Sequence, residues 1–290
     1  MNRRIVPNFF IVGMPRCGTS SMVTYLKQHP DVYLSPFKEP HFFAKDLNMP
    51  TNYIWREDLY HSLFDGVKHE TAVGEASVWY LSSQLAAGMI RQFNPEAKII
   101  VMLRDPVRQM ESLHGLWVRS GNEPEPDFLE ALELEERRKR GLDISPATYF
   151  PYGLFYREVA AYYQKVKRFF DLFPRRQIHI VLFHDFIQRM AEVTREVLEF
   201  LQVDDTFQPE FDIERANVKI RKQALLQLRH VHPEIRRMLK EGMRKLRPPL
   251  QRKQVPKTVE MELRHGLRED ILRLEKLIAR DLSLWKGGET

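Results

Sequence analysis

The sequence has 290 residues, of which 43% are hydrophobic and 29% are charged, as in an ordinary globular protein with one large core. Its net charge of +6 is compatible with anionic ligands such as nucleotides, sulfated products or nucleic acid. The charge alone does not choose among these ligands, and a solvated basic surface is the simpler explanation of it.

One cysteine, Cys17, excludes an internal disulfide framework and a cysteine-rich metal cluster, and it favours a reducing compartment. The apolar run 5–14 is short, is interrupted by Pro7 and lacks a small-residue cleavage pattern, so it predicts a strand and not a signal peptide. No stretch approaches the roughly 20 apolar residues of a membrane span. We therefore expect a cytoplasmic protein without a membrane span.

Strand and helix patterns alternate along the first two thirds of the chain. Short apolar runs predict strands at 9–12, 32–34, 70–74, 98–103 and 177–183. Helical spacing predicts helices at 19–29, 82–93, 128–140, 153–173 and 191–201, and another that Pro106 opens. This alternation predicts an α/β fold with a central parallel sheet of about five strands flanked by helices.

The last third of the chain has a different character. Beyond Arg215 the sequence is basic and helical without clear strands, and it ends in an amphipathic helix predicted at 259–282. We expect a single domain over 1–290, with an α/β core at 8–205 and a mainly helical C-terminal extension at 206–290.

The segment Gly13–Ser21, with the sequence GMPRCGTSS, joins the first strand to the first helix. In an open parallel sheet, ligands bind beyond the carboxyl ends of the strands, where such a loop offers backbone N–H groups and a helix dipole to an anion. The predicted anion-binding residues are Arg16, Cys17, Gly18, Thr19, Ser20 and Ser21. The loop therefore predicts a P-loop-like phosphate site.

A nucleoside triphosphatase would carry the pattern G-x-x-x-x-G-K-[ST] at this loop. Thr19 stands at the lysine position of that pattern, and the cation lies inside the loop at Arg16. ATP hydrolysis is disfavoured, although a P-loop nucleotide or metabolite kinase remains the main alternative. A glycine turn without any ligand is the second alternative.

A second anion site is predicted after the strand at 98–103. Arg104 follows that strand, and Ser112 comes eight residues later in the second turn of the helix that Pro106 opens. Arg108 shares a helix face with Ser112. Arg104 and Ser112 could hold a second phosphate, although an arginine capping the sheet edge and a solvated serine would give the same pattern.

These motifs resemble those of the PAPS-dependent sulfotransferase family. Gly13–Ser21 is similar to its 5′-phosphosulfate loop, and 103–108 with Ser112 is similar to its 3′-phosphate element. The segments 38–43 (KEPHFF) and 74–80 (GEASVWY) resemble heparan-type and bacterial carbohydrate sulfotransferases. The resemblance extends from about residue 8 to 205, and the first two motifs together make it specific.

The resemblance implies an enzyme that transfers a sulfuryl group from 3′-phosphoadenosine 5′-phosphosulfate (PAPS) to a hydroxyl or amine by in-line displacement. The product of the donor is adenosine 3′,5′-bisphosphate. The expected partner is a carbohydrate or small-molecule acceptor, with no nucleic acid and no metal ion. The sequence leaves open the acceptor's identity, the choice between O- and N-sulfation, and the oligomeric state.

The resemblance also assigns catalytic roles. Glu39 matches the catalytic base, Arg16 would neutralise the 5′-phosphate and the transferring group, and His41 is the alternative base. In an extended segment Glu39 and His41 would line one cleft wall, with Lys38 on the other side. Alternatively, the neighbouring phenylalanines pack in the core and these polar residues are only surface.

Two residues depart from the pattern of the heparan-type relatives. Heparan-type relatives have Lys at the position of Ala76 and Asp at that of Ala44, which argues against a simple transfer of substrate identity.

The basic segment 252–257 could close over a 3′-phosphate, although it is no clear copy of the family's loop. A non-catalytic anion-binding or nucleic-acid-binding protein that uses the basic tail is the third hypothesis.

Overall fold

The computed structural model describes residues 5–49, 53–212, 234 and 255–287. The chain divides into two compact units, each described by itself below. Unit 1 contains residues 1–47, 51–103 and 169–243, and unit 2 contains 48–50, 104–168 and 244–290.

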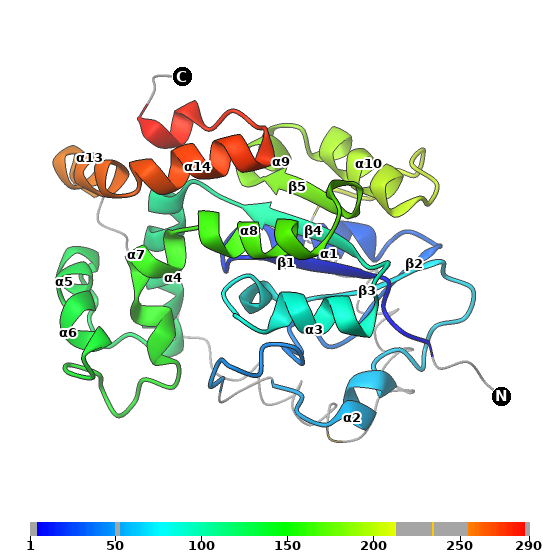
Figure 1. Cartoon of the computed structure of the whole chain (residues 1–290), viewed down its shortest axis with the longest axis horizontal. Helices are drawn as coiled ribbons and strands as arrows, with labels where there is room; N and C mark the ends of the chain where they lie inside the picture. The colour runs from blue at the N-terminus through cyan, green and yellow to red at the C-terminus, as the bar shows by residue number, and fades with distance from the viewer. Residues whose placement is uncertain (1–4, 50–52, 213–233, 235–254, 288–290) are drawn as a thin grey trace. The chain divides into compact units, whose positions relative to one another are not determined.

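The core of unit 1 is a five-stranded parallel sheet in the order β2-β3-β1-β4-β5, visible at the centre of Figure 1. The strands are β1 (Phe9–Gly13), β2 (Val32–Leu34), β3 (Ala72–Ala76), β4 (Lys98–Leu103) and β5 (Ile178–Leu182). All residues of β1 are buried, as its unbroken apolar run requires for a strand covered on both faces. The predicted fold class is confirmed.

The strand order places a topological switch point between β1 and β4. The chain leaves β1 toward β2 on one side of the sheet and leaves β4 toward β5 on the other side. β1 and β4 pair in register, with Gly13 opposite Met102, so both strands end at the same edge. Crevices at such points are where ligands of open α/β sheets bind.

The helices of unit 1 follow the predicted pattern with shifted ends. They are α1 (Thr19–Leu26), α2 (Glu57–Ser62), α3 (Ala86–Phe93), α9 (Phe183–Gln188) and α10 (Met190–Leu201), with short 3-10 turns η1 (Val78–Tyr80) and η3 (Arg175–Gln177). The predicted helix at 82–93 begins only at Ala86. The reason is Ser83, whose hydroxyl accepts the amides of Leu85 and Ala86 and so ends the preceding turn.

Unit 2 is helical in its described residues. Its elements are α4 (Pro106–Ser120), α5 (Phe128–Glu133), α6 (Glu135–Lys139), η2 (Pro151–Leu154), α7 (Tyr156–Ala160), α13 (Lys257–Gly266), α14 (Arg268–Ile278) and η4 (Ser283–Lys286). α8 (Tyr163–Leu172) begins in unit 2 and ends in unit 1. Pro106 opens α4 as predicted. Across the described parts of the chain, we find no helix with the length and apolarity that crossing a bilayer requires.

The predicted long helix at 153–173 is wrong. The chain leaves the helical region at Ala161, where ψ is 108°, and α8 begins anew after it. The Asp270 carboxylate accepts the amides of Tyr162 at 2.8 Å and Tyr163 at 3.1 Å, and thereby caps the start of α8. This cap comes from a residue far along the chain, so a local helical pattern does not predict it.

The predicted helices at 128–140 and 259–282 are also divided. The first breaks at Leu134 into α5 and α6. The second breaks at Leu267, between α13 and α14. Ala279, with a left-handed φ of 52°, then ends α14 before residue 282. Most of the basic tail from 215, with Arg252 and Lys253, lies outside the described residues.

Gly13 permits a close approach that a larger residue would block. A Cβ atom at Gly13 would lie 2.4 Å from the Met102 carbonyl oxygen of β4. We expect Gly13→Ala to lower the free energy of unfolding by about 1–3 kcal/mol, measured by urea denaturation.

Gly88→Ala in α3 is the matched control, because a Cβ atom at Gly88 meets nothing within 4 Å. That variant should gain roughly 0.5–1 kcal/mol from the helix propensity of alanine. Equal urea midpoints for the two variants would contradict the close approach at Gly13.

Candidate functional site

The loop after β1 turns sharply before α1 begins. The Cys17 amide donates to the Met14 carbonyl at 3.3 Å, and Arg16 and Gly18 have left-handed φ angles of 75° and 90°. A left-handed arginine costs about 1–3 kcal/mol of backbone strain, a cost that concentrates at functional positions. At Gly18 a Cβ atom would lie 2.8 Å from the Phe183 ring, so only glycine fits there.

The N-terminus of α1 has no side-chain cap. Its N-cap is Gly18, which makes no side-chain cap, and its first turn contains no acidic residue. The backbone N–H groups and the positive end of the helix dipole therefore have no carboxylate or hydroxyl of the cap to satisfy them. Arg16 and Ser20 are exposed and Ser21 is half-buried, whereas Cys17 and Thr19 are buried. The predicted binding residues of the loop thus differ in what they can present to a ligand.

The structure brings Glu39 and His41 together, but not through an extended segment. Both residues have left-handed φ angles, 63° and 51°, on either side of Pro40. Nε2 of His41 lies 3.6 Å from Oε2 of Glu39. The Lys38 ammonium donates to Oε1 of the same carboxylate, so the expectation that Lys38 faces away is wrong. We call residues 38–41 the base turn.

The electrostatics of the base turn keep Glu39 ionised. Burial opposes ionisation of the Glu39 carboxyl, but the Lys38 ammonium and the His41 ring outweigh it and hold the pKa of Glu39 below its usual value. The carboxylate is therefore available as a proton acceptor at neutral pH, although a low pKa makes it a weak base.

Glu39 is better placed than His41 to reach a substrate. The side chain of Glu39 is 30% exposed and that of His41 only 2%. One ring nitrogen of His41 faces Glu39, while the other, Nδ1, is buried and has no hydrogen-bond partner among the described residues. His41 is thus positioned to orient the carboxylate.

A second acidic residue, Glu75, lies completely buried in β3. Its carboxylate accepts the hydroxyls of Tyr80 at 2.6 Å, Ser77 at 2.7 Å and Tyr60 at 3.2 Å. Burial raises the pKa of Glu75 to about 7, against the lowering effect of these hydrogen bonds. In the sequence Glu75 is a lone charged residue within an otherwise apolar strand, which distinguishes it from its neighbours. No role was predicted for it.

The second predicted anion site lies in unit 2, where Arg104 follows Leu103 of β4 directly. Ser112 is buried in α4, with 2% of its surface exposed. The N-terminus of α4 is capped by Asp105, whose carboxylate accepts the Arg108 amide at 3.0 Å. Arg108 donates its side chain to Glu111 at 3.0 Å and to Glu260 at 2.8 Å, so two carboxylates already neutralise it.

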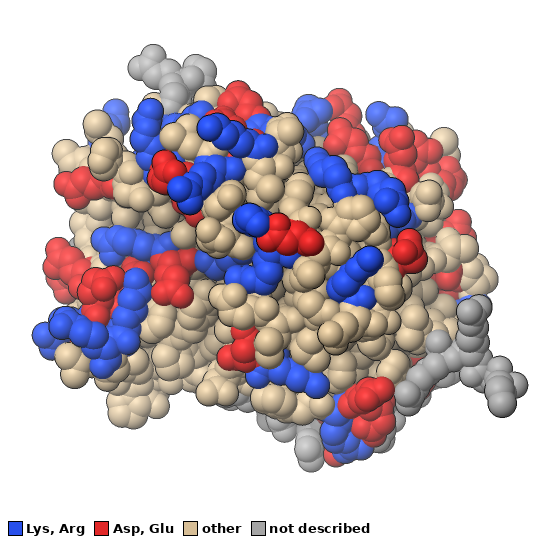
Figure 2. Space-filling view, in the orientation of Figure 1, with Lys and Arg blue, Asp and Glu red and all other residues tan. Residues whose placement is uncertain are grey.

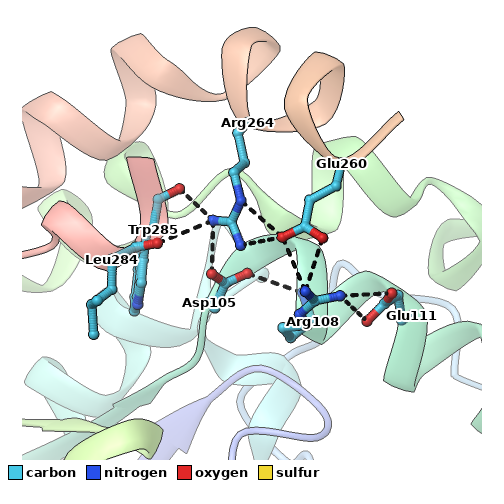
Figure 3. Close-up of polar contacts among 7 residues, drawn as sticks. All are labelled: Asp105, Arg108, Glu111, Glu260, Arg264, Leu284 and Trp285. Atoms are coloured by element: carbon cyan, nitrogen blue, oxygen red, sulfur yellow. Dashed lines mark hydrogen bonds and ion pairs between the residues drawn. The ribbon is translucent and has the colours of Figure 1, made fainter. Parts of the chain in front are cut away.

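Figure 3 shows that Arg264 of α13 is the centre of this polar cluster. Its guanidinium donates to Asp105 at 2.8 Å, to Glu260 at 2.8 Å and to the Trp285 carbonyl at 2.6 Å. Only 12% of the Arg264 side chain is exposed. Asp105 therefore serves two partners, the amide that it caps and the arginine of a distant helix. The sequence did not indicate Arg264, since its i,i+4 pairing with Glu260 is typical of any solvated helix.

The charges on the surface are mixed. On the face that Figure 2 shows, lysines and arginines of the described chain alternate with aspartates and glutamates, and they do not gather in one basic field. In the same described residues, no group of three or more histidines, cysteines, aspartates or glutamates is arranged to hold a metal ion.

Comparison with known proteins adds three findings. A family model described as "Sulfotransferase domain" matches residues 6–245. The crystal structure of a sulfotransferase from Alicyclobacillus acidocaldarius superposes with a TM-score of 0.77 and 34% identity, over 97% of this chain and 99% of that one. Carbohydrate sulfotransferase 15 of Mus musculus is 28% identical over 69% of this chain.

A second curated relative is heparan sulfate glucosamine 3-O-sulfotransferase 3B1 of Homo sapiens, 26% identical over 68% of this chain. The match covers 44% of the mouse protein and 46% of the human one. This chain therefore spans less than half the length of the curated relatives that it matches.

Arg264 should contribute to the stability of unit 2. Arg264→Ala leaves Asp105 and Glu260 without their shared cation, and we expect a loss of about 1–3 kcal/mol in the free energy of unfolding, measured by urea denaturation. Arg273→Ala is the control in α14. Its pair with Glu269 is 55% and 72% exposed, and its guanidinium lies 5.7 Å from the Tyr163 ring centroid, so less than about 1 kcal/mol should be lost. Similar losses for both variants would show that the Arg264 contacts are no stronger than a surface pair.

Proposed function

This chain belongs to the sulfotransferase family, and we propose that it transfers a sulfuryl group from PAPS to an acceptor hydroxyl or amine. The observation that carries the proposal is the loop Gly13–Ser21, which leads to an uncapped helix N-terminus at the switch point of the sheet. Backbone N–H groups and a helix dipole at that place suit an anionic donor.

We propose that the two donor phosphates are bound by different motifs. Arg16, Cys17, Gly18, Thr19, Ser20 and Ser21 would bind the 5′-phosphosulfate, with Arg16 and Ser20 offering exposed side chains and the buried residues offering their backbone. Arg104 and Ser112 would bind the 3′-phosphate that distinguishes PAPS from other adenine nucleotides. After transfer the same residues would hold adenosine 3′,5′-bisphosphate.

Glu39 is the proposed base. Its ionised carboxylate would take the proton of the acceptor as the acceptor atom bonds to sulfur and the bond between sulfur and the 5′-phosphate oxygen breaks. Arg16 would stabilise the negative charge that grows on the departing phosphate oxygen. His41, buried against Glu39, would orient the base and would replace it only if Glu39 proves dispensable.

A carbohydrate is the proposed acceptor class. The support comes from the curated relatives, which are a carbohydrate sulfotransferase and a heparan sulfate glucosamine sulfotransferase. Ala76 and Ala44 stand where the heparan-type pattern has a lysine and an aspartate, which argues against a simple transfer of the heparan-type substrate to this chain.

The other two functions weighed from the sequence have less support. A P-loop kinase needs a lysine at the position of Thr19. Nucleic-acid binding would use the basic tail, most of which lies outside the described residues, and the family match over residues 6–245 does not favour it. A single sulfotransferase domain over 1–290 and a cytoplasmic location, which the lone Cys17 favours, remain predictions.

Glu39→Gln tests the base. The amide keeps the size of the side chain but accepts no proton, so we expect transfer from labelled PAPS to carbohydrate acceptors to fall by about 100-fold or more. Binding of adenosine 3′,5′-bisphosphate, measured by calorimetry, should change less than about twofold. Full activity in Glu39→Gln together with its loss in His41→Ala would transfer the role of base to His41.

Arg104→Ala tests the 3′-phosphate site. Loss of a charge-assisted hydrogen bond to phosphate should weaken binding of adenosine 3′,5′-bisphosphate by about 10- to 100-fold and leave binding of adenosine 5′-phosphate almost unchanged. Arg108→Ala is the matched control, because Glu111 and Glu260 already neutralise Arg108. Equal affinities of the Arg104 variant and the wild type for the bisphosphate would refute the assignment.

A further inference from the structure

The base turn needs an external support, because two of its residues adopt a costly backbone. Glu39 and His41 both have left-handed φ angles, a conformation that is unfavourable for residues other than glycine. Such a conformation persists only where neighbouring groups determine it. The groups that hold the backbone of this turn and of the residues after it therefore set the position of the Glu39 carboxylate.

The amides of every second residue in the segment 39–43 donate hydrogen bonds to one stretch of chain, which is the end of β3 and the turn after it. The Glu39 amide donates to the Ala76 carbonyl at 2.9 Å. The His41 amide donates to the Ser77 hydroxyl at 3.1 Å, and the Phe43 amide donates to the Tyr80 hydroxyl at 3.3 Å. Two of the three supports are therefore side-chain hydroxyls, which can rotate away unless something fixes them.

Glu75 fixes both hydroxyls. An amide N–H can only donate, so each hydroxyl must accept from the amide and has its own hydrogen left to donate. Ser77 donates it to Oε2 of Glu75 at 2.7 Å, and Tyr80 donates it to Oε1 at 2.6 Å. Each carboxylate oxygen thus directs one hydroxyl toward one amide of the segment.

The surroundings of Glu75 make this arrangement rigid. Glu75, Ser77 and Tyr80 are all fully buried, so water does not compete for their hydrogen bonds. The aromatic rings of Phe43 and Tyr60 pack against each other and Phe43 also packs against Tyr80, with ring centroids 5.3 Å and 5.7 Å apart. An apolar side chain in place of Glu75 would leave both hydroxyls undirected.

We propose that Glu75 is a positioning residue for transfer, acting through the hydroxyls of Ser77 and Tyr80 on the backbone that presents Glu39. Glu75 itself touches neither donor nor acceptor in this role. The inference rests on the proposed function in one respect, the role of Glu39 as base. The placement of the His41 and Phe43 amides is independent of that role.

Tyr60 offers a matched control within the same cluster. Its hydroxyl also donates to Oε1 of Glu75, at 3.2 Å, and it is equally buried. Tyr60 does not accept from the His41 or Phe43 amide, whose acceptors are Ser77 and Tyr80. Tyr60→Phe therefore removes a buried hydroxyl from Glu75 without removing a link to the segment, whereas Tyr80→Phe and Ser77→Ala each remove one link.

The first measurement is amide hydrogen exchange, resolved by residue in the full chain at pH 8, where Glu75 is ionised. The His41 amide should exchange at least about 10-fold faster in Ser77→Ala, and the Phe43 amide should do so in Tyr80→Phe. Both should keep wild-type rates in Tyr60→Phe. Unchanged rates in the first two variants, or equally raised rates in the Tyr60 variant, would overturn the proposal.

The second measurement is turnover with PAPS. Ser77→Ala and Tyr80→Phe should lower kcat by about 10- to 100-fold, because a small displacement of a catalytic group is costly, with affinity for adenosine 3′,5′-bisphosphate within about twofold of wild type. Tyr60→Phe should keep kcat within about twofold. Faster exchange with an unchanged kcat would overturn the positioning role. A wild-type protein that transfers nothing would instead refute the proposed function, while the exchange result still tests the links.

Discussion

The parallel pairing of β1 with β3 on one side and β4 on the other is the constraint on which the rest of unit 1 depends. Three buried strands that run the same way must end at the same edge, and polar groups can reach solvent only beyond those ends. The loop at Gly13 and the segment after Ala76 both begin there. The close contact of Gly13 with the Met102 carbonyl shows how little room the packing of this edge leaves.

Two carboxylates near this edge have opposite environments. Glu39 is partly exposed beside a cation, so its pKa is lowered and its charge is maintained. Glu75 is enclosed and bonded only to neutral hydroxyls, so its pKa is raised to about 7. The two pKa values differ because a positively charged neighbour lowers the pKa of an acid, whereas burial raises it. An accessible acid can exchange protons with a ligand, whereas an enclosed one can only hold its neighbours in place.

The sequence predicted those features that depend on neighbours along the chain. β4 has the predicted bounds because an unbroken apolar run defines it, and Pro106 opens α4 as expected. The break at Ala161 escaped prediction because the cap comes from Asp270, which is distant in sequence. For the same reason no local pattern revealed that Arg264 pairs with Asp105. The meeting of Glu39 with His41 was predicted, but from an extended backbone that the structure does not have.

Cys17 acquires a practical meaning from its position in the loop Gly13–Ser21. It is the sole thiol of the chain and it is fully buried between Arg16 and Gly18. An alkylating reagent can reach this sulfur only when the loop departs from the described conformation. The rate at which the native protein is alkylated therefore measures how often the loop opens. This measurement requires neither an introduced label nor a known acceptor.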